Sequence, residues 1–225
     1  MVQPTYTVQR TREKPQLDAG WDHPVWEKAQ TLAVDNFHPM STEHRPVTRA
    51  RLLYDTEALY GIFRVEDRYV ICTHMNYQDS VCRDSCVEFF VKPASSPGYQ
   101  NFEMNCCGTL LTQYIRDPER DQGGFKDAVK VPPEIGRKVA VRGSLDGPIP
   151  EEITEPAVWT VQFRIPLEVL EEYAGPIGDP CGQEWRANFY KCADDSSHPH
   201  WAAWAPIGKN LNFHQPAKFA PVYFD

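Results

Sequence analysis

Two short segments of the chain alternate acidic or amide side chains with apolar ones. They are residues 84–91 (DSCVEFFV) and residues 101–106 (NFEMNC). Because side chains of a β-strand point alternately to opposite faces, Glu88 lies on one face of the first segment, and Glu103 and Asn105 share one face of the second. If the two strands pair with their apolar sides inward, these three side chains line one polar surface. The sequence therefore predicts the functional site on that surface.

Carboxylate and amide groups in such a site suit the hydroxyls of a sugar. The apolar C–H faces of the same sugar stack on aromatic rings, so a saccharide site needs both kinds of side chain. Four aromatic residues in the second half of the chain are candidate platforms for stacking: Tyr190, Trp201, Trp204 and Phe213. Together with Glu88, Glu103 and Asn105 they predict that the chain binds a mono-, oligo- or polysaccharide.

Short alternating segments separated by turn residues must position these groups. Twenty prolines and thirteen glycines are spread over 225 residues, which favours frequent turns over long helices. We expect strands at residues 5–10, 48–54, 59–66, 84–91, 101–106, 110–115, 138–142, 158–165, 185–192 and 219–224. Residues 166–173 predict a short helix, and residues 116–127 and 143–156 predict loops. This pattern indicates an all-β protein: an antiparallel, jelly-roll-like β-sandwich with one or two short helices, forming a single domain over residues 1–225.

Charge and apolar content exclude several classes of partner. The chain carries 23 basic and 31 acidic residues, for a net charge of −8, and has no basic stripe, so nucleic acid is not an expected partner. No stretch of 18 apolar residues occurs, and the N-terminus lacks the apolar region of a signal peptide. We therefore expect no membrane insertion and no export signal, while the compartment stays open. The seven cysteines contain no CxxC pair, which favours buried free thiols over a zinc site.

Several of these segments, in this order, resemble the family 9 carbohydrate-binding module superfamily, a jelly-roll-like sandwich attached to xylanases. The matching pieces are residues 18–26 (DAGWDHPVW), 53–55 (LYD), 59–63 (LYGIF), 65–67 (VED), 84–90 (DSCVEFF), 99–105 (YQNFEMN), 159–166 (WTVQFRIP), 185–188 (WRAN) and 213–219 (FHQPAKF). The resemblance covers nearly the whole chain. It implies non-catalytic carbohydrate binding that assists the breakdown of polysaccharides of the xylan or cellulose type.

The resemblance also implies roles for single residues. In the sugar-binding members two aromatic rings clamp a terminal sugar, and polar side chains bind its hydroxyls. By position the carboxylate corresponds to Glu88, the sheet amide to Asn105, a loop amide to Asn210 and one clamp ring to Phe213. The second clamp position falls near residues 81–82, where this chain has no aromatic residue.

Two further features follow from the same resemblance. Glu103 stands where the family pattern has an arginine. The family also binds calcium through loop carboxylates, and Asp67 corresponds to one of these positions. Asp79 and Asp84 lie nearby in the sequence and offer the oxygen ligands that calcium prefers. We therefore expect a structural calcium ion at these three residues.

Two other functions remain open at this point. Glu88 and Glu103 on neighbouring strands could form the acid and nucleophile of an enzyme that hydrolyses O-glycosyl bonds, although no catalytic motif accompanies them. Alternatively, the sandwich could have lost sugar binding and serve as a protein-interaction scaffold. Turnover of an aryl glycoside would indicate the enzyme, and a blank glycan array would indicate the scaffold.

Overall fold

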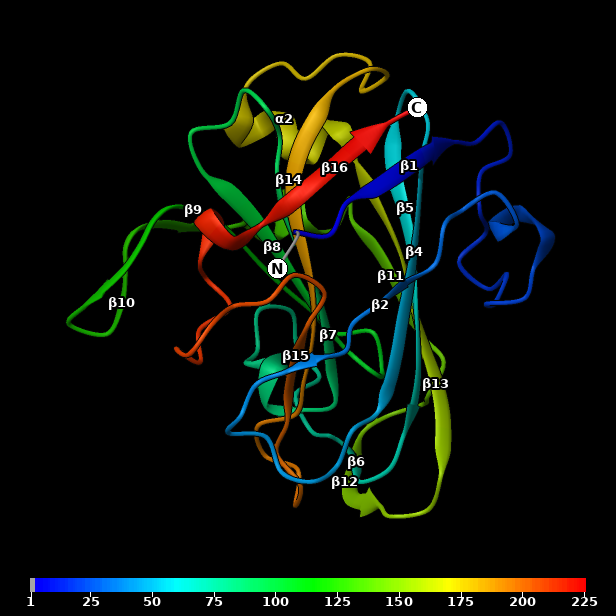
Figure 1. The fold of residues 1–225 in the computed structure, drawn as a ribbon, viewed down its shortest axis with the longest axis vertical. Coiled ribbons are helices and arrows are strands. Elements are labelled where there is room, and N and C mark those ends of the chain that lie inside the picture. The colour runs from blue at the N-terminus through cyan, green and yellow to red at the C-terminus, as the bar shows by residue number, and fades with distance from the viewer. Residues whose placement is uncertain (1–2) are drawn as a thin grey trace.

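The computed structural model describes residues 3–225 as a β-sandwich whose two sheets share one strand (Figure 1). The first sheet has the strand order β10 (Gly124–Lys130), β9 (Leu110–Asp121), β8 (Tyr99–Asn105), β7 (Cys86–Lys92), β14 (Glu184–Cys192) and β16 (Ala220–Phe224). The second has the order β4 (Val47–Tyr54), β5 (Ala58–Asp67), β13 (Ala157–Pro166) and β11 (Ala140–Gly143). The sandwich predicted from alternation and turn signals is confirmed.

Strand β1 (Tyr6–Arg10) connects the two sheets. Its first residues pair in parallel with residues 222–224 of β16, and its last two pair in parallel with residues 53–54 of β4. The predicted antiparallel sandwich therefore has one exception, since β1 pairs in parallel with both of its neighbours. Antiparallel pairing follows where a short hairpin joins two strands, and no hairpin joins β1 to either neighbour.

Shorter elements complete the chain. The remaining strands are β2 (Leu32–Ala33), β3 (Asn36–Phe37), β6 (Val70–Cys72), β12 (Ile149–Ile153) and β15 (Trp201–Ala203). The helices are η1 (Pro24–Trp26), η2 (Val81–Arg83), α1 (Pro133–Gly136), α2 (Leu167–Ala174) and η3 (Pro216–Lys218). The helix expected at residues 166–173 is α2. Within residues 3–225, none of the helices is long and apolar enough to cross a membrane.

The main hydrophobic core lies between the two sheets. Phe89 of β7 and Phe189 of β14 meet Phe63 of β5 and Phe163 of β13, with ring centroids 4.9–6.0 Å apart for the closest pairs. All four side chains are at most 1% exposed. The apolar faces predicted for β7 and β8 therefore do point inward, and this orients Glu88 and Glu103 toward the opposite, outer face.

A second apolar layer covers the outer face of the first sheet. Phe90, Tyr99 and Tyr190 lie on this face and pack beneath residues 205–219, a segment that contributes Ile207 and Phe219. We call residues 205–219 the covering segment. Residues 211–214 of this segment border a hollow that also exposes Glu88 and Glu103.

Two regions predicted to be loops are strands. Residues 116–127 comprise the end of β9, the turn and the start of β10, and these two paired strands form a ribbon. Residues 149–153 form β12, which pairs with β6. Alternating apolar residues are absent from the ribbon because charge pairs replace them. Arg116 donates two hydrogen bonds to Asp127, at 2.7 and 2.8 Å, across the two strands.

Candidate functional site

Glu88 and Glu103 form the floor of the hollow. The pairing of β7 with β8 places them directly opposite each other. Directly opposed residues have Cβ atoms about 4.5–5.5 Å apart, so the two carboxyl groups are close neighbours. Glu88 is 2% exposed and Glu103 is 5% exposed, so both lie at the bottom of the hollow rather than on its rim.

Each carboxyl group accepts a hydrogen bond from a buried neighbour. The thiol of Cys192 donates to Oε1 of Glu88 at 3.2 Å, and Nδ2 of Asn101 donates to Oε1 of Glu103 at 2.8 Å. Asn101 is itself fixed, because its Oδ1 accepts from the backbone nitrogen of Gln113 at 2.5 Å. Among residues 3–225, no side chain or backbone group hydrogen-bonds to the second oxygen of either carboxyl group. That oxygen is therefore free to bind a ligand.

Both carboxyl groups hold their protons more tightly than usual. Burial raises the pKa of Glu103 to about 7, and the charge of Asp194 adds to the effect. Burial and the neighbouring Glu103 raise the pKa of Glu88 well above its ordinary value. Below about pH 7 the floor of the hollow therefore offers neutral carboxylic acids, which donate a hydrogen bond as well as accept one.

Apolar side chains form one wall. The ring of Phe213 stacks on that of Tyr190, with centroids 4.1 Å apart and planes 13° apart, and the Tyr190 hydroxyl donates to the Phe213 carbonyl at 3.0 Å. Trp201 lies beside Cys192 because β15 pairs with the end of β14, and its Nε1 donates to Oδ1 of Asp194 at 2.7 Å. Both rings are held in position by these contacts, which suits them to stacking.

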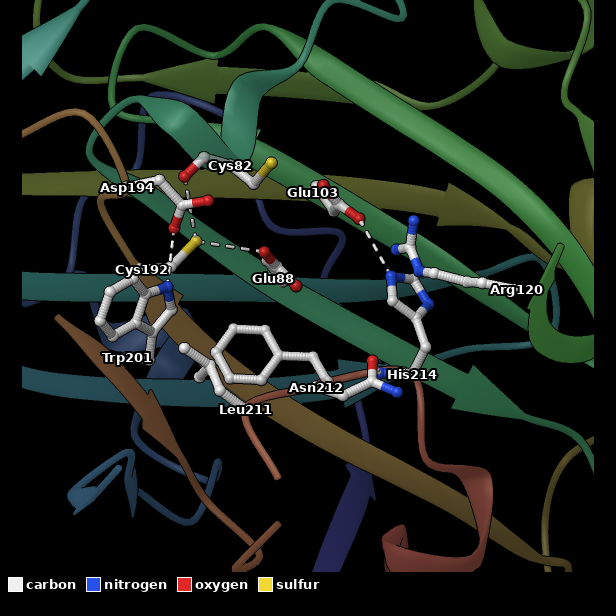
Figure 2. A pocket seen from close by; sticks show the side chains of 11 residues that line it. Cys82, Glu88, Glu103, Arg120, Cys192, Asp194, Trp201, Leu211, Asn212 and His214 are labelled. Atoms are coloured by element: carbon white, nitrogen blue, oxygen red, sulfur yellow. Dashed lines mark hydrogen bonds and ion pairs between the residues drawn. The ribbon is translucent and has the colours of Figure 1, made fainter. Parts of the chain in front are cut away.

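Basic groups form the opposite end. His214 hydrogen-bonds to the Tyr99 hydroxyl through Nδ1 at 2.9 Å, while its Nε2 lies 4.0 Å from Oε1 of Glu103. Burial and the adjacent Arg120 lower the pKa of His214 to about 3, so this imidazole is neutral near pH 7. Figure 2 shows the side chains of His214 and Arg120 together next to Glu103.

We call this hollow the carboxyl pocket. Its volume is about 270 Å³, and its walls consist of Cys82, Glu88, Glu103, Arg120, Cys192, Asp194, Trp201, Leu211, Asn212, Phe213 and His214 (Figure 2). A second cavity of about 520 Å³ shares Cys82, Glu103, Arg120 and His214 with it and extends over β8, β9 and β10. The two cavities therefore adjoin at these four residues.

Three of the seven predicted ligand-binding residues meet in the carboxyl pocket: Glu88, Glu103 and Phe213. Trp201, a candidate platform from the sequence, also lines it. The pairing register explains the convergence of the two glutamates, since alternation fixed their faces and the register set them opposite each other.

Asn105 does not reach the pocket. It is fully buried at the end of β8, where its Nδ2 donates to Oδ2 of Asp84 at 2.8 Å and to the carbonyl of His74 at 2.7 Å. Its Oδ1 accepts from the backbone nitrogen of Thr109 at 2.9 Å. Alternation placed Asn105 on the face of Glu103, but the strand ends at this residue and the amide holds the next turn together. The prediction of a binding role for Asn105 is therefore corrected to a structural one.

The other three predicted ligand-binding residues also lie outside the pocket. Tyr190 is fully buried beneath Phe213, so it supports the wall without lining it. Trp204 belongs to the main core, where it packs edge-on against Phe189 with centroids 5.7 Å apart. Asn210 is an exposed residue of the covering segment and is not among the lining residues. The sequence could not distinguish aromatic residues of the core from aromatic residues that stack on a ligand, because both kinds have the same residue types and similar neighbours in the sequence.

Asp67, Asp79 and Asp84, the predicted calcium ligands, do not converge. Within residues 3–225, two clusters of possible metal ligands have their ligand atoms within 4.8 Å of one another. Neither cluster contains any of the three aspartates. Asp67 is buried and faces positive groups and donors: His44 Nε2 at 2.8 Å, and Lys191 Nζ at 3.5 Å.

Donors also occupy the other two carboxylates. Asp84 accepts from the backbone nitrogens of Thr73 and His74 at 2.9 and 3.0 Å, in addition to Asn105. Asp79 accepts from the backbone nitrogen of Asn76 at 2.8 Å and closes a short turn. Because these carboxylates already carry the donors that a cation would have to replace, the three residues do not fit a calcium ion, and the ligand set predicted for it is wrong.

Several lining residues escaped the sequence analysis. Arg120 lies in the region read as a loop, and Asp194 and Leu211 lie in irregular segments where alternation gives no information. Cys82, Cys192 and His214 were visible as residue types, but only the folded chain brings them to Glu88 and Glu103. Only its position next to Phe213 in the sequence indicated that His214 lines the same pocket.

The comparison with protein families decides the identity of the chain. The model of carbohydrate-binding family 9 matches residues 24–224, which is most of the chain. The chain belongs to this family. The predicted resemblance is confirmed, and with it carbohydrate binding as the class of function and saccharides as the class of partner.

Solved structures agree with the family assignment. A putative carbohydrate-binding protein from Bacteroides uniformis is 26% identical, with a TM-score of 0.87 and coverage of 100% of both chains. Two structures of a family 9 module from Caldicellulosiruptor kristjanssonii, solved with glucose and with cellotriose, are 15% identical with TM-scores of 0.59 and 0.62. They cover 99% of this chain and 96% and 94% of their own, and they show the same fold. A search of curated proteins found no match.

Proposed function

We propose that the family 9 chain binds the end residue of a saccharide in the carboxyl pocket, without catalysis. The observation that carries this proposal is the combination on one small surface of two protonated carboxyl groups, Glu88 and Glu103, with the supported rings of Trp201 and Phe213. The pocket volume of about 270 Å³ lies near the lower limit for small-molecule sites, which suits one sugar residue.

The chemistry of the walls matches the two sides of a sugar ring. The C–H face stacks on an indole or phenyl ring. Hydroxyl groups act as both donors and acceptors, and a neutral carboxylic acid pairs with either role. Arg120 adds a cationic donor at the far end, where it offsets the loss of a carboxyl proton.

The second cavity indicates that the ligand is longer than one residue. It continues from Glu103 over β8 to β10 and has polar walls that include Asn101, Gln113 and Lys130. The related module from C. kristjanssonii was solved with glucose and with cellotriose, which supports a β-linked glucan for this chain as well. A role as an accessory to cellulose or xylan breakdown follows from such binding.

Removal of either ring is expected to weaken saccharide binding by about five- to thirtyfold. Stacking and the burial of a ring together contribute about 1–2 kcal/mol, and 1.4 kcal/mol corresponds to a factor of ten. The measurement is calorimetric titration with glucose and cellotriose of the wild type, Phe213→Ala and Trp201→Ala. Tyr223→Ala is the matched control, because Tyr223 is an exposed aromatic residue of β16 that lines neither cavity. Equal affinities in all four proteins would refute the proposed site, and a wild type that binds no sugar on a glycan array would favour the scaffold.

Hydrolysis by the Glu88 and Glu103 pair remains the second candidate, because the two groups do face one pocket. A glycosidase needs one ionised carboxylate beside one protonated acid. Burial raises the pKa of both groups, to about 7 for Glu103, so the ionised partner is scarce below about pH 7. We expect no release of nitrophenol from aryl glucosides or xylosides. Turnover that Glu88→Gln abolishes would establish the enzyme.

A further inference from the structure

Three cysteines and a methionine, none of which lines the carboxyl pocket, gather beside the end of β8. The ligand atoms of Cys72, Cys106 and Cys107 all lie within 4.8 Å of one another. Sγ of Cys106 lies 4.0 Å from Sγ of Cys107, and Sγ of Cys72 lies 3.9 Å from Sδ of Met75. We call these four residues the sulfur cluster. All seven cysteines are free thiols, so none of this sulfur is used in a disulfide.

The spacing of the sulfur atoms fits a shared metal ion. A metal–sulfur bond of about 2.3 Å in a tetrahedral site places neighbouring sulfur atoms roughly 3.8 Å apart. The separations of 3.9 Å between Cys72 and Met75 and of 4.0 Å between Cys106 and Cys107 are close to this value. The three thiols are thus spaced as ligands of one ion, and the Met75 thioether lies next to one of them.

Backbone contacts hold the two ligand-bearing segments together. The backbone nitrogen of Cys106 donates to the Ser85 carbonyl at 2.9 Å. The Asn105 amide donates to the His74 carbonyl, and the His74 backbone nitrogen donates to Asp84. This is the structural role of the Asn105 amide noted above. It places Cys72 and Met75 on one side and Cys106 and Cys107 on the other before any ion arrives.

The cluster has space and an entrance. A Cβ atom at Gly147 would lie 2.6 Å from Sγ of Cys107 and 3.1 Å from Cε of Met75, so glycine leaves room for both sulfur side chains. Cys72 and Cys106 are fully buried, whereas Cys107 is half-buried and lines an open groove together with Met75. An ion can therefore enter from solvent along this groove.

We propose that the sulfur cluster binds a soft, thiophilic metal ion, and that this ion is Cu(I). Thiolate and thioether ligands together select Cu(I), because the thioether of methionine is a poor ligand for harder divalent cations. On binding, the coordinating thiols release their protons to solvent and the oxidation state of the metal does not change. The site uses residues that the saccharide proposal does not need, so either proposal can fail alone.

The test is an anaerobic titration of the reduced protein with Cu(I) against the chromophoric chelator bicinchoninate. We expect one tightly bound ion per chain and a loss of at least 100-fold in affinity in Cys107→Ser, whose partly exposed position tolerates the substitution. Met75→Leu should lower the affinity for Cu(I) about tenfold and leave the affinity for Zn(II) unchanged. X-ray absorption should report sulfur ligands only.

Two control variants separate this cluster from the other thiols. Cys181→Ser removes a lone exposed thiol, and Cys192→Ser disrupts the group of Cys86, Glu88 and Cys192 in the carboxyl pocket, which is also close enough to hold an ion. Both should bind Cu(I) like the wild type. Absence of stoichiometric binding, retention of it in Cys107→Ser, or loss of it in Cys192→Ser would each overturn the proposed site. Zn(II) binding that outcompetes Cu(I) would overturn the choice of metal.

Discussion

Replacing Lys191 by methionine is expected to lower the free energy of unfolding by about 3–5 kcal/mol, because it leaves a buried carboxylate without its cation. Lys191 and Asp67 are both fully buried at the side chain, with Nζ and Oδ2 3.5 Å apart. Lys191 also donates to Nε2 of His200 at 2.7 Å and to the Cys192 carbonyl at 3.0 Å. Methionine matches the length of the lysine stem, so loss of charge dominates the effect.

The protonation states of the neighbouring groups make Lys191 the main cation that balances the buried charge of Asp67. Burial alone would raise the pKa of Asp67, but Lys191 and a hydrogen bond from His44 hold it well below its usual range. Burial and Lys191 lower the pKa of His200 to about 3, so this imidazole is neutral and accepts a hydrogen bond from the lysine ammonium group. After the substitution Asp67 keeps hydrogen bonds to His44, to the Arg68 backbone nitrogen and to Nε1 of Trp159, but it loses the lysine ammonium group.

Urea unfolding followed by circular dichroism measures this effect. The matched control is Lys14→Met, which removes the same side chain from an exposed ion pair with Glu57 and should change stability by less than about 1 kcal/mol. Lys191→Met combined with Asp67→Asn should recover part of the loss, because no buried charge remains. Similar stability of the two single variants would show that the buried pair contributes nothing.

The second large effect concerns Glu103 and pH. A carboxyl group whose pKa is raised by folding stabilises the native state fully below its unfolded pKa of about 4.3, and this contribution disappears as pH rises through the folded pKa. For Glu103 the folded pKa is about 7. The wild type should therefore lose about 3–4 kcal/mol of stability between pH 4 and pH 8 relative to Glu103→Gln, since a difference of about 2.7 pKa units corresponds to about that energy.

Unfolding measured at both pH values tests this expectation. Glu103→Gln also removes the neighbour that raises the pKa of Glu88, so the second carboxyl changes the result in the same direction. Glu151→Gln, an exposed glutamate of β12, is the control and should follow the wild type at both pH values. An identical pH dependence in wild type and Glu103→Gln would show that the pocket carboxyl ionises normally.

Local pattern predicted much of the sheet, because alternation is a property of single strands. It oriented Phe89 inward and Glu88 outward correctly, and the family resemblance located Phe213. Predictions failed where the outcome depends on segments far apart in the sequence. Trp204 lies in the core and Trp201 lines the carboxyl pocket because of the path that residues 193–219 take. These residues show no alternation of apolar and polar side chains from which that path could be predicted.

Charge pairing was also invisible before folding. Asp67 was predicted as a calcium ligand because it corresponds to a calcium position of the family, but Lys191 reaches it from a distant strand. In the same way, no spacing rule connects Cys72 with the adjacent Cys106 and Cys107. Such contacts depend on which strand ends meet, and sequence pattern specifies strand ends poorly.

The position of β1 between β16 and β4 has a consequence for biosynthesis. The hydrogen-bonding edge that holds residues 6–8 belongs to a strand made more than two hundred residues later. On the ribosome, the amino-terminal segment therefore has no stable place on that edge until β16 emerges, and the nascent sandwich stays open along one seam. Chaperones that shield exposed strand edges would act on this seam during translation.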